Sequence, residues 1–175
     1  MYVARKNMKS KVGELCLYAS DKGLVAIAWE NQKLSGFPSS DIRLDDRVDD
    51  SHPILILAES QLEEYFSGSR KSFDIPLDFC IGTGFQKSVW SALLSIPYGE
   101  TRSYAQMAIQ IGNERAVRAV GAANGKNPIP IIVPCHRVIG SSGTLVGFAG
   151  GLENKRILLD HEFSHALTNR ELACV

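Results

Sequence analysis

Three prolines within seven residues, Pro128, Pro130 and Pro134, constrain the fold of this chain more than any other feature of its sequence. Proline fixes φ and has no backbone N–H, so neither a regular helix nor a central strand can run through this stretch. The neighbouring residues are apolar, and Pro134 places Cys135 at a break in regular structure. A histidine and an arginine follow Cys135 directly, and such neighbours lower the pKa of a thiol and raise the fraction of nucleophilic thiolate.

The pair of Cys135 and His136 needs further groups to act as a nucleophile and its base. Adjacent residues on a regular strand point to opposite faces, so a bend or a bridging water is required. A histidine base also needs a third group that fixes its tautomer. The carboxylates downstream are Glu153, Asp160 and Glu162, and spacing does not choose among them. The residues alone leave two readings open, a reactive pair or a buried cysteine beside a surface histidine.

Composition excludes several classes of protein. The 175 residues are 45% hydrophobic and 22% charged, which is typical of a globular chain and not of a fibrous or disordered one. The longest apolar runs, residues 54–58 and 129–135, are far too short to span a bilayer. The basic start of the chain continues into polar residues and not into the apolar core of a secretory signal. We therefore expect a cytoplasmic protein with no membrane partner.

The charges are unevenly distributed although their sum is zero. Residues 1–80 hold ten basic and thirteen acidic side chains, and residues 81–175 hold nine and six. Residues 101–137 contain five basic side chains and one acidic one, which are Arg102, Arg115, Arg118, Lys126 and Arg137 against Glu114. This local excess predicts a small patch that faces phosphates.

The four cysteines show no metal-binding pattern. Cys16, Cys80, Cys135 and Cys174 lie far apart, without CxxC spacing or a nearby histidine pair, so we expect no structural metal. In a reducing compartment they should be free thiols. We assign Cys16 and Cys80 to the core and Cys174 to the tail, because only Cys135 has surroundings that would activate it.

The first half of the chain begins with a predicted β-hairpin. Residues 12–29 read as two short strands around the turn Ser20-Asp21-Lys22-Gly23, in which the glycine is available for positive φ. The acidic residues 41–50 have no evident pattern of burial. We expect a loop there.

A helix and a strand are predicted to complete this half. Apolar residues at helical spacing predict a helix over residues 53–66 that ends at Ser67-Gly68. A strand is expected at residues 73–77. Residues 1–80 would thus form a small mixed domain in which nothing suggests chemistry.

The second half reads as helical up to residue 126. Thr83 can cap a helix that stops at residues 97–99, and its expected apolar face is Phe85, Val89, Leu93 and Leu94. Ser103 and Gln106 match a capping box, which opens a short helix ending at Gly112. Asn113 can cap the next helix, residues 114–123. Two short helices around a glycine-containing turn are a helix-turn-helix candidate.

The second of these helices carries an unusual surface. Its expected core-facing residues are Val117 and Val120. Arg115, Arg118 and Ala122 lie together on the opposite side, with Gly121 beside them. Small residues with two projecting arginines would let this helix approach a narrow DNA groove closely. The plainer alternative is an alanine-rich helix with ordinary solvated arginines.

The segment Pro134-Cys135-His136-Arg137-Val138-Ile139-Gly140 resembles the signature of the O6-alkylguanine-DNA alkyltransferases. Asn127-Pro128 before it, and Gly150-Gly151 and Leu158-Leu159-Asp160-His161-Glu162 after it, fit the same family. The resemblance covers residues 85–162 closely and the N-terminal half only loosely. It implies an α/β (α+β) fold with a small ribonuclease H-like N-terminal domain over residues 1–80. A mostly helical C-terminal domain, residues 81–175, would contain a winged-type helix-turn-helix.

The resemblance also implies roles for positions of this chain. Cys135 would accept the alkyl group, His136 would deprotonate it through a water, and Glu162 would orient the histidine. Asn127 is similar to the family asparagine that ties the active-site turn to the helix-turn-helix. The implied substrate is O6-alkylguanine in DNA, with O4-alkylthymine as a second one, and no cofactor is implied. Because S-alkylcysteine is a stable thioether, each molecule should act once.

The implied partner is alkylated double-stranded DNA, bound by a monomer through the minor groove. Base flipping would be needed because the O6 alkyl carbon is not exposed to a protein thiol in duplex DNA. Arg118 matches the arginine that replaces the flipped guanine, and Tyr104 the tyrosine that crowds the 3′ phosphate and bonds the base. The other residues that the resemblance places at the DNA or the base are Arg115, Gly121, Ala122, Val138, Phe148 and Ala149.

Two of these positions depart from the commoner pattern of the family. Phe148 stands where many members carry tyrosine, so a hydroxyl is missing but stacking on the base is retained. Ala149 stands where some members have serine, which should matter little if its backbone N–H holds the guanine O6. Backbone carbonyls of Cys135 and Val138 would accept from the exocyclic amine.

Two other functions remain as alternatives. A Cys-His-Glu set also suits a cysteine hydrolase or acyltransferase, but that chemistry leaves Arg118 and the helix-turn-helix unexplained. A DNA-binding module, either a regulator or a non-transferring damage sensor, is the second. A sensor would be expected to lack Cys135, and a regulator is more often a basic dimer with base-reading side chains on its second helix.

Overall fold

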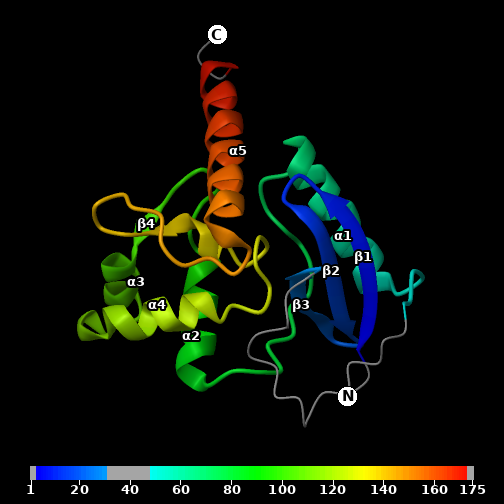
Figure 1. The fold of residues 1–175 in the computed structure, drawn as a ribbon, viewed down its shortest axis with the longest axis horizontal. Coiled ribbons are helices and arrows are strands. Elements are labelled where there is room, and N and C mark those ends of the chain that lie inside the picture. The colour runs from blue at the N-terminus through cyan, green and yellow to red at the C-terminus, as the bar shows by residue number, and fades with distance from the viewer. Residues whose placement is uncertain (1–2, 31–47, 173–175) are drawn as a thin grey trace. The chain divides into compact units, whose positions relative to one another are not determined.

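The computed structural model describes residues 3–30 and 48–172, and the side chains of the last helix as far as residue 167. The chain divides into two compact units (Figure 1). Unit 1 is Met1–Gly82 with Pro128–Pro130, and unit 2 is Thr83–Asn127 with Ile131–Val175. Unit 1 contains a small sheet and one helix, and unit 2 is mostly helical, which confirms the predicted fold class. Of the loop predicted at residues 41–50, residues 41–47 lie outside the described residues.

The sheet of unit 1 has three antiparallel strands in the order β1-β2-β3. They are β1 (Ala4–Ser10), β2 (Gly13–Ser20) and β3 (Gly23–Trp29). All seven residues of β3 are buried, and Leu17 pairs with Ile27 between β2 and β3. The predicted hairpin is therefore confirmed. Strand β1 was not predicted, because its sequence ARKNMKS carries little of the apolar alternation that indicates a strand.

Gly23 serves a different purpose from the predicted one. It does not have positive φ, but a Cβ at this position would lie 2.6 Å from the Pro76 carbonyl oxygen. The chains come this close because Leu24 N donates to Pro76 O at 2.8 Å. Glycine is thus required here for close approach and not for its dihedral freedom.

The strand predicted at residues 73–77 does not form. Only Leu77 makes a bridge, with Leu24, and Asp78 N donates to Leu24 O at 2.8 Å. Pro76 has no N–H with which to extend a ladder. The prediction was therefore wrong, although this segment does run along β3.

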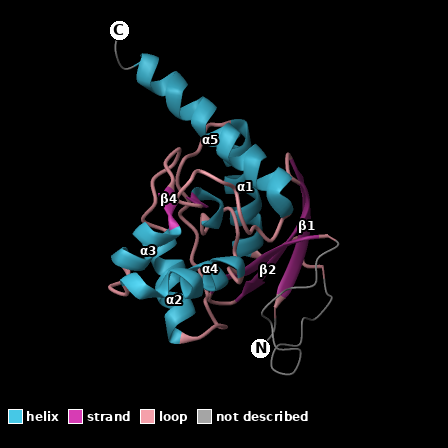
Figure 2. Cartoon of the chain, turned by 60° about the vertical axis from the view of Figure 1, so that its left-hand side comes forward, coloured by secondary structure: helices cyan, strands magenta, loops and turns pink. Residues whose placement is uncertain are grey.

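Helix α1 (Pro53–Ser67) covers one face of the sheet and contacts all three strands (Figure 2). Proline is favourable at the start of a helix, where its missing N–H has no partner to lose. The helix ends at Gly68, whose φ is 84° and whose N–H bonds to Tyr65 O at 3.0 Å. The predicted helix and its glycine terminus are confirmed.

Helix α2 (Gly84–Leu93) begins with a capping box at the predicted residue. Gln86 N donates to Thr83 Oγ1 at 3.2 Å, and Thr83 N donates to Gln86 Oε1 at 2.8 Å. The buried residues of this helix are Val89, Trp90 and Leu93. Leu94 was expected on the same face, but its side chain is 45% exposed because the helix has already ended.

Helices α3 (Tyr104–Gln110) and α4 (Val117–Gly125) form the predicted helix-turn-helix. The capping box at Ser103 is present, and Gly112 ends α3 with φ of 74°. A 3-10 turn, Glu114–Ala116, precedes α4, and the Asn113 side chain makes no capping hydrogen bond. The predicted Asn113 cap was wrong, and a 3-10 turn, not an α-helix, directly follows this residue, whose N–H bonds back to Ala108 O at 2.9 Å.

The remaining elements of unit 2 are two short strands and a long C-terminal helix. The two-residue strands β4 (Arg102–Ser103) and β5 (Val138–Ile139) pair in parallel, and the long helix α5 spans Gly151–Leu172. Within the described residues, no helix is both long and apolar enough to cross a membrane.

Candidate active site

Cys135 opens a 3-10 turn, Cys135–Arg137, that directly precedes β5. Cys135 N donates to Val133 O at 2.8 Å, and Arg137 N donates to Pro134 O at 3.0 Å. Asn127 Nδ2 also donates to Val133 O, at 2.8 Å. The break in regular structure expected at Pro134 is confirmed, and it holds Cys135 in a buried position, 3% exposed.

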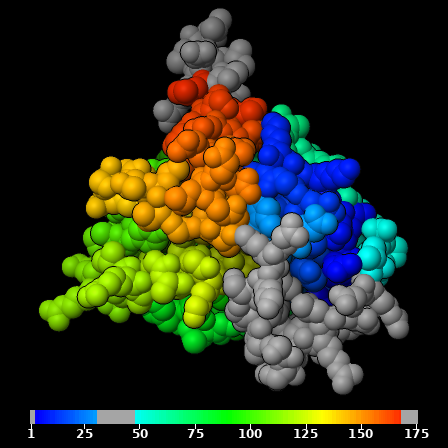
Figure 3. Space-filling model, viewed as in Figure 1, coloured from blue at the N-terminus to red at the C-terminus, as the bar shows by residue number. Residues whose placement is uncertain are grey.

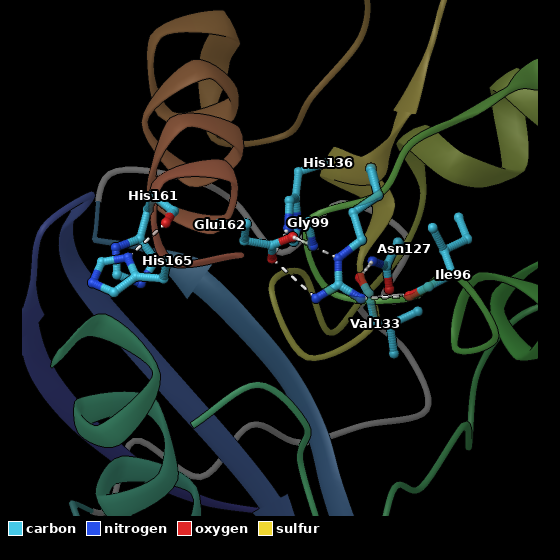
Figure 4. Close-up of polar contacts among 9 residues, drawn as sticks. Ile96, Gly99, Asn127, Val133, His136, His161, Glu162 and His165 are labelled. Carbon is cyan, nitrogen blue, oxygen red and sulfur yellow. Dashed lines mark hydrogen bonds and ion pairs between the residues drawn. The ribbon is translucent and has the colours of Figure 1, made fainter. Parts of the chain in front are cut away.

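His136 Nε2 and Glu162 Oε1 lie 2.8 Å apart, and both side chains are buried (Figure 4). Of the three carboxylates that the sequence left open, only Glu162 contacts the histidine, and Glu153 and Asp160 are exposed. A carboxylate accepts hydrogen bonds, so Nε2 carries the proton and Nδ1 has the lone pair. Nδ1 is buried and has no hydrogen-bond partner among the described residues.

Glu162 accepts from three further donors. Arg137 donates from Nε at 2.9 Å and from Nη2 at 3.0 Å, and Gly99 N donates at 3.1 Å. Gly99 has φ of 74°, and a Cβ there would lie 2.8 Å from the Cβ of Ala166. Glycine therefore allows the backbone to come near enough to α5 to bind the carboxylate.

Arg137 does not belong to a phosphate-facing patch, and that prediction was wrong. Its side chain is 7% exposed, and Nη1 donates to Ile96 O at 2.6 Å. The guanidinium carbon lies 5.7 Å from the centre of the Tyr98 ring. The planar fork of arginine matches a carboxylate with two parallel hydrogen bonds, so Glu162 competes successfully with solvent for this side chain.

Burial favours the neutral form of His136, and the charges around it act in both directions. Burial alone would raise the pKa of the Glu162 carboxyl, but the hydrogen bonds and charges of His136 and Arg137 hold that pKa well below its usual range. Burial lowers the pKa of His136, and Glu162 opposes this only in part. Because Arg137 already balances Glu162, a protonated His136 would add an uncompensated buried charge.

The Cys135 thiol is protonated at rest. Burial raises its pKa to about 11, against the opposing effects of the Asn127 side chain, the Lys155 charge and backbone N–H groups. A thiol of this kind needs a nearby proton acceptor to become a nucleophile. The Nδ1 lone pair of the next residue is a suitable acceptor.

Comparison with known proteins decides the family. Residues 84–164 match the DNA binding domain of 6-O-methylguanine DNA methyltransferase, and residues 3–79 match the ribonuclease-like domain of the same family. The chain belongs to the 6-O-methylguanine DNA methyltransferase family.

Individual relatives agree along most of the chain. A methylated-DNA–protein-cysteine methyltransferase of Methanosarcina acetivorans is 47% identical over 156 residues, which are 89% of this chain and 96% of the relative. The enzyme of that name from Mycobacterium leprae is 58% identical over 115 residues, 66% of this chain and 69% of the relative. The crystal structure of Mycobacterium tuberculosis OGT in complex with DNA is 44% identical, covers 94% of both chains and has a TM-score of 0.82.

Several residues that the sequence predicts to contact DNA or the flipped guanine lie near the Cys135 turn. Tyr104 Oη donates to Val146 O at 3.2 Å, which joins α3 to the loop of residues 140–150. The Phe148 ring lies edge-on to His136, with 6.5 Å between ring centres. Val138 is fully buried, and Ala149 is half-buried.

The predicted DNA-facing surface of α4 is exposed. Arg118 and Ala122 on α4 are exposed, as is Arg115 in the 3-10 turn before the helix, and Gly121 is half-buried. Val120 is buried as expected, whereas Val117 is only half-buried. Figure 3 shows α4 in yellow-green on the same face as the loop of residues 140–150, in yellow-orange.

Three polar or glycine positions at the site were missed from the sequence. Gly99 binds Glu162, as described above. Asn124 is 2% exposed and donates from Nδ2 to Cys135 O at 3.4 Å. Lys155 is fully buried and donates to two backbone carbonyls. The burial of Lys155 could have been predicted from helical spacing. Lys155 lies three and four positions before Leu158 and Leu159, which are buried, and so shares their face of α5.

The other cysteines differ in burial. Cys16 is in the core as predicted. Cys80 was expected there too but is exposed, because it follows a segment that forms no strand. Cys174 lies outside the described residues. In the part of the chain that the structure describes, no group of His, Cys, Asp and Glu residues could hold a metal ion.

Proposed function

We propose that this chain repairs DNA by direct reversal, moving a methyl group from O6-methylguanine to Sγ of Cys135. The observation that carries this proposal is the buried His136, whose Nε2 is held by Glu162 while Nδ1 has no hydrogen-bond partner in the described part of the chain. Such a base can take the proton of the preceding thiol through one water. The names of the relatives, and the DNA complex of one of them, support the same activity.

The transfer is a single displacement in which all atoms balance. Cys135 Sγ gives its proton, through water, to His136 Nδ1. The thiolate attacks the methyl carbon, so an S–C bond forms as the O6–C bond breaks. The electron pair stays on guanine, which takes up one proton from water and becomes the ordinary base, while the His136 imidazolium returns its extra proton to water. The thioether has no hydrolytic route back to a thiol, so each molecule acts once.

Glu162 and Asn127 act on the reacting residues without touching the base. Glu162 fixes the tautomer of His136 and stabilises the imidazolium that forms. Asn127 fixes Val133, whose carbonyl also accepts from the Cys135 N–H, and so sets the turn that carries the thiol.

DNA binding would use the exposed side of α4. Arg118 projects from an exposed helix surface of alanine and glycine, and Arg115 is exposed in the 3-10 turn just before it, which suits a narrow groove. We propose that this helix enters the minor groove of alkylated DNA, that Arg118 fills the gap left by the flipped nucleotide, and that Gly121 and Ala122 permit the close approach. Tyr104, exposed in part at the start of α3, would meet the 3′ phosphate.

The flipped guanine would lie against the loop of residues 140–150. Phe148 supplies a ring for stacking, the N–H of Ala149 would bind O6, and the carbonyls of Cys135 and Val138 would accept from the amine. O4-alkylthymine is a second substrate of this proposal. We further propose that the chain works in the cytoplasm, because a reducing compartment preserves the acceptor thiol. It would act as a monomer and without a cofactor.

The intact mass of the protein after mixing with an oligonucleotide that carries O6-methylguanine tests the function. We expect one added methyl group per chain, located at Cys135 by peptide mapping. Repeated release of product without a mass change would instead support a cysteine hydrolase or acyltransferase. DNA binding with neither mass change nor release would support a damage sensor.

A further inference from the structure

Asn124 is a buried asparagine in the last turn of α4, and only one atom of its amide has a hydrogen-bond partner. The side chain is 2% exposed. Its Nδ2 donates to Cys135 O at 3.4 Å, whereas Oδ1 is buried and has no hydrogen-bond partner among the described residues. The opposite orientation of the amide would set two acceptor oxygens against each other. The atom without a partner is therefore an acceptor.

The asparagine at this position does not help the fold. A buried polar atom without a hydrogen bond costs free energy, and an apolar side chain of the same shape has no such cost. Such an atom is useful where a second molecule supplies the missing partner. His136 Nδ1 is a buried atom of the same kind, and the proposed reaction gives it the thiol proton. Asn124 Oδ1 needs a donor in the same way, and the substrate is the molecule that the site receives.

Asn124 lies next to residues that the proposed function assigns to the flipped guanine. Its bond to Cys135 O brings it to one of the two carbonyls assigned to the exocyclic amine. Gly121, one turn earlier on α4, lies against Tyr104, because a Cβ at this glycine would be 3.7 Å from the ring carbon Cδ1. Residues three positions apart share a helix face, so Asn124 is on the side of α4 that meets Tyr104.

The two carbonyls assigned to the amine already have donors within the protein. Cys135 O accepts from the Val138 N–H as well as from Asn124, and Val138 O accepts from Lys155 Nζ at 2.6 Å. Oδ1 has no donor, so an N–H from the base would remove a cost there that the carbonyls do not carry. O6-methylguanine has one donor group, its exocyclic amine, whereas O4-methylthymine has no N–H at all.

We propose that Asn124 is a specificity-determining residue for alkyl transfer, whose Oδ1 accepts a hydrogen bond from the exocyclic amine of the flipped O6-alkylguanine. Asn124 thereby favours O6-alkylguanine over O4-alkylthymine, which leaves this buried acceptor unsatisfied. A site with a buried hydrogen-bonding group discriminates strongly against an analogue that lacks the matching group. This inference rests on the proposed function, since the base is the one that this function brings to Cys135.

Asn124→Leu and three oligonucleotides test the proposal. The oligonucleotides carry O6-methylguanine, O6-methylhypoxanthine, which is the same base without the amine, or O4-methylthymine. The measured quantity is the single-turnover rate of methyl transfer from each. The preference for O6-methylguanine over either base without the amine should narrow about tenfold in Asn124→Leu, because one hydrogen bond is lost. A folded Asn124→Leu protein with the wild-type preference would overturn the proposal.

Two further variants make the result specific to the acceptor. Asn124→Asp keeps an acceptor oxygen but loses Nδ2, so the preference should be at least as large as in the wild type. Loss of the preference in Asn124→Asp would show that Nδ2 acts through Cys135 O, and it would overturn the role of Oδ1. Asn7→Leu is the matched control. Asn7 Nδ2 also donates at 3.4 Å, to Glu14 Oε1, but this residue is exposed on β1, so neither rate nor preference should change.

Thermal unfolding separates this role from a structural one. Asn124→Leu should unfold at or above the wild-type temperature, because it removes a buried polar atom that has no partner. If Asn124→Leu does not fold, Asn124→Ala takes its place, and a wild-type preference in Asn124→Ala overturns the proposal.

The wild-type protein separates this inference from the function on which it rests. Absence of methyl transfer by the wild type from all three oligonucleotides would refute the proposed function and this inference with it. Transfer by the wild type with a preference that Asn124→Leu matches would refute the role of Asn124 alone.

Discussion

Both units of the chain contain arginine–glutamate pairs, and Arg70–Glu64 of unit 1 differs sharply in burial from Arg137–Glu162 of unit 2. In unit 1, Arg70 Nε lies 2.6 Å from Glu64 Oε2, and the side chains are 28% and 44% exposed. In unit 2, Arg137 Nε lies 2.9 Å from Glu162 Oε2, and the exposures are 7% and 1%. The shorter distance belongs to the more exposed pair, so distance does not tell which pair matters.

Environment decides what each pair does. Solvent screens the Arg70–Glu64 pair, and such exposed pairs contribute about 0–1 kcal/mol to stability. Arg137 and Glu162 are out of water, and each would be a buried charge without the other. The buried pair need not stabilise the fold more than apolar residues would. It acts on the pKa of His136, which Glu162 raises and Arg137 lowers, in addition to the larger effect of burial.

The largest effect is expected for Cys135→Ser, which removes the thiol that would accept the methyl group next to the buried Arg137–Glu162 pair. We expect complete loss of methyl transfer, measured by intact mass, with DNA affinity by fluorescence anisotropy close to wild type. Cys80→Ser is the matched control, because Cys80 is an exposed cysteine outside the Cys135 turn. Methylation of Cys135→Ser at another cysteine would contradict the assignment.

Arg137→Met and Arg70→Met compare the pairs directly. Loss of Arg137 leaves Glu162 as an unpaired buried charge, so the free energy of unfolding should fall by about 3–5 kcal/mol. Arg70→Met should cost at most about 1 kcal/mol. Urea unfolding of both variants measures the difference. The unpaired carboxylate should also raise the pKa of His136, so transfer by Arg137→Met should weaken as pH falls. Equal stability losses would break the comparison.

Glu162→Gln keeps the shape of the cluster and removes its charge. His136 then becomes a poorer proton acceptor, and transfer should slow about a hundredfold. Glu162 raises the pKa of His136, so without it the loss of rate on acidification should move to lower pH, and the rate should vary less between about pH 6 and 9. Stopped mixing with duplex substrate gives the profile. Glu64→Gln should change neither rate nor profile.

Arg118→Ala tests an arginine whose proposed role depends on exposure. Transfer from duplex DNA should slow about ten- to a hundredfold, because an empty gap in the base stack costs a few kcal/mol. Reaction with free O6-alkylguanine base should change little. Similar losses on both substrates would place Arg118 in the pocket or the fold, and no loss on either would make it a solvated surface arginine.

Gly68→Ala should have the smallest effect and should be confined to unit 1. Alanine at φ of 84° is strained, so the free energy of unfolding should fall by about 1 kcal/mol. Methyl transfer per folded molecule should stay at the wild-type value, because Gly68 serves only the end of α1. Thermal unfolding and the intact-mass assay measure the two quantities.

Local rules predicted the parts of the fold that depend on neighbouring residues. The caps at Thr83 and Ser103 and the glycine that ends α1 all form within four residues of the chain, and all three are present as predicted. The residues of the Cys135 turn were found in the same way, from prolines and a short signature. The cap predicted at Asn113 is absent, and the residues directly after it form a 3-10 turn and not the start of an α-helix.

The features that the sequence did not predict depend on hydrogen bonds between residues that are far apart in the chain. Arg137 looked like a surface cation until its bond to Ile96, 41 residues away, and its pairing with Glu162, 25 residues away, were visible. Gly99 gave no signal, since its bond to Glu162 on α5 joins residues 63 positions apart in the chain. The choice of Glu162 over Asp160 and Glu153 likewise depends on which side of α5 meets the turn.

The burial of Cys135 also determines how long an unused molecule lasts. Oxidation and adventitious alkylation proceed through the thiolate and need access to sulfur. A side chain that is 3% exposed, with a pKa raised to about 11, offers neither in the absence of a substrate. For a protein that reacts once, the repair capacity of a cell equals the number of intact thiols, so the same buried position that slows the resting chemistry preserves that number until damaged DNA arrives.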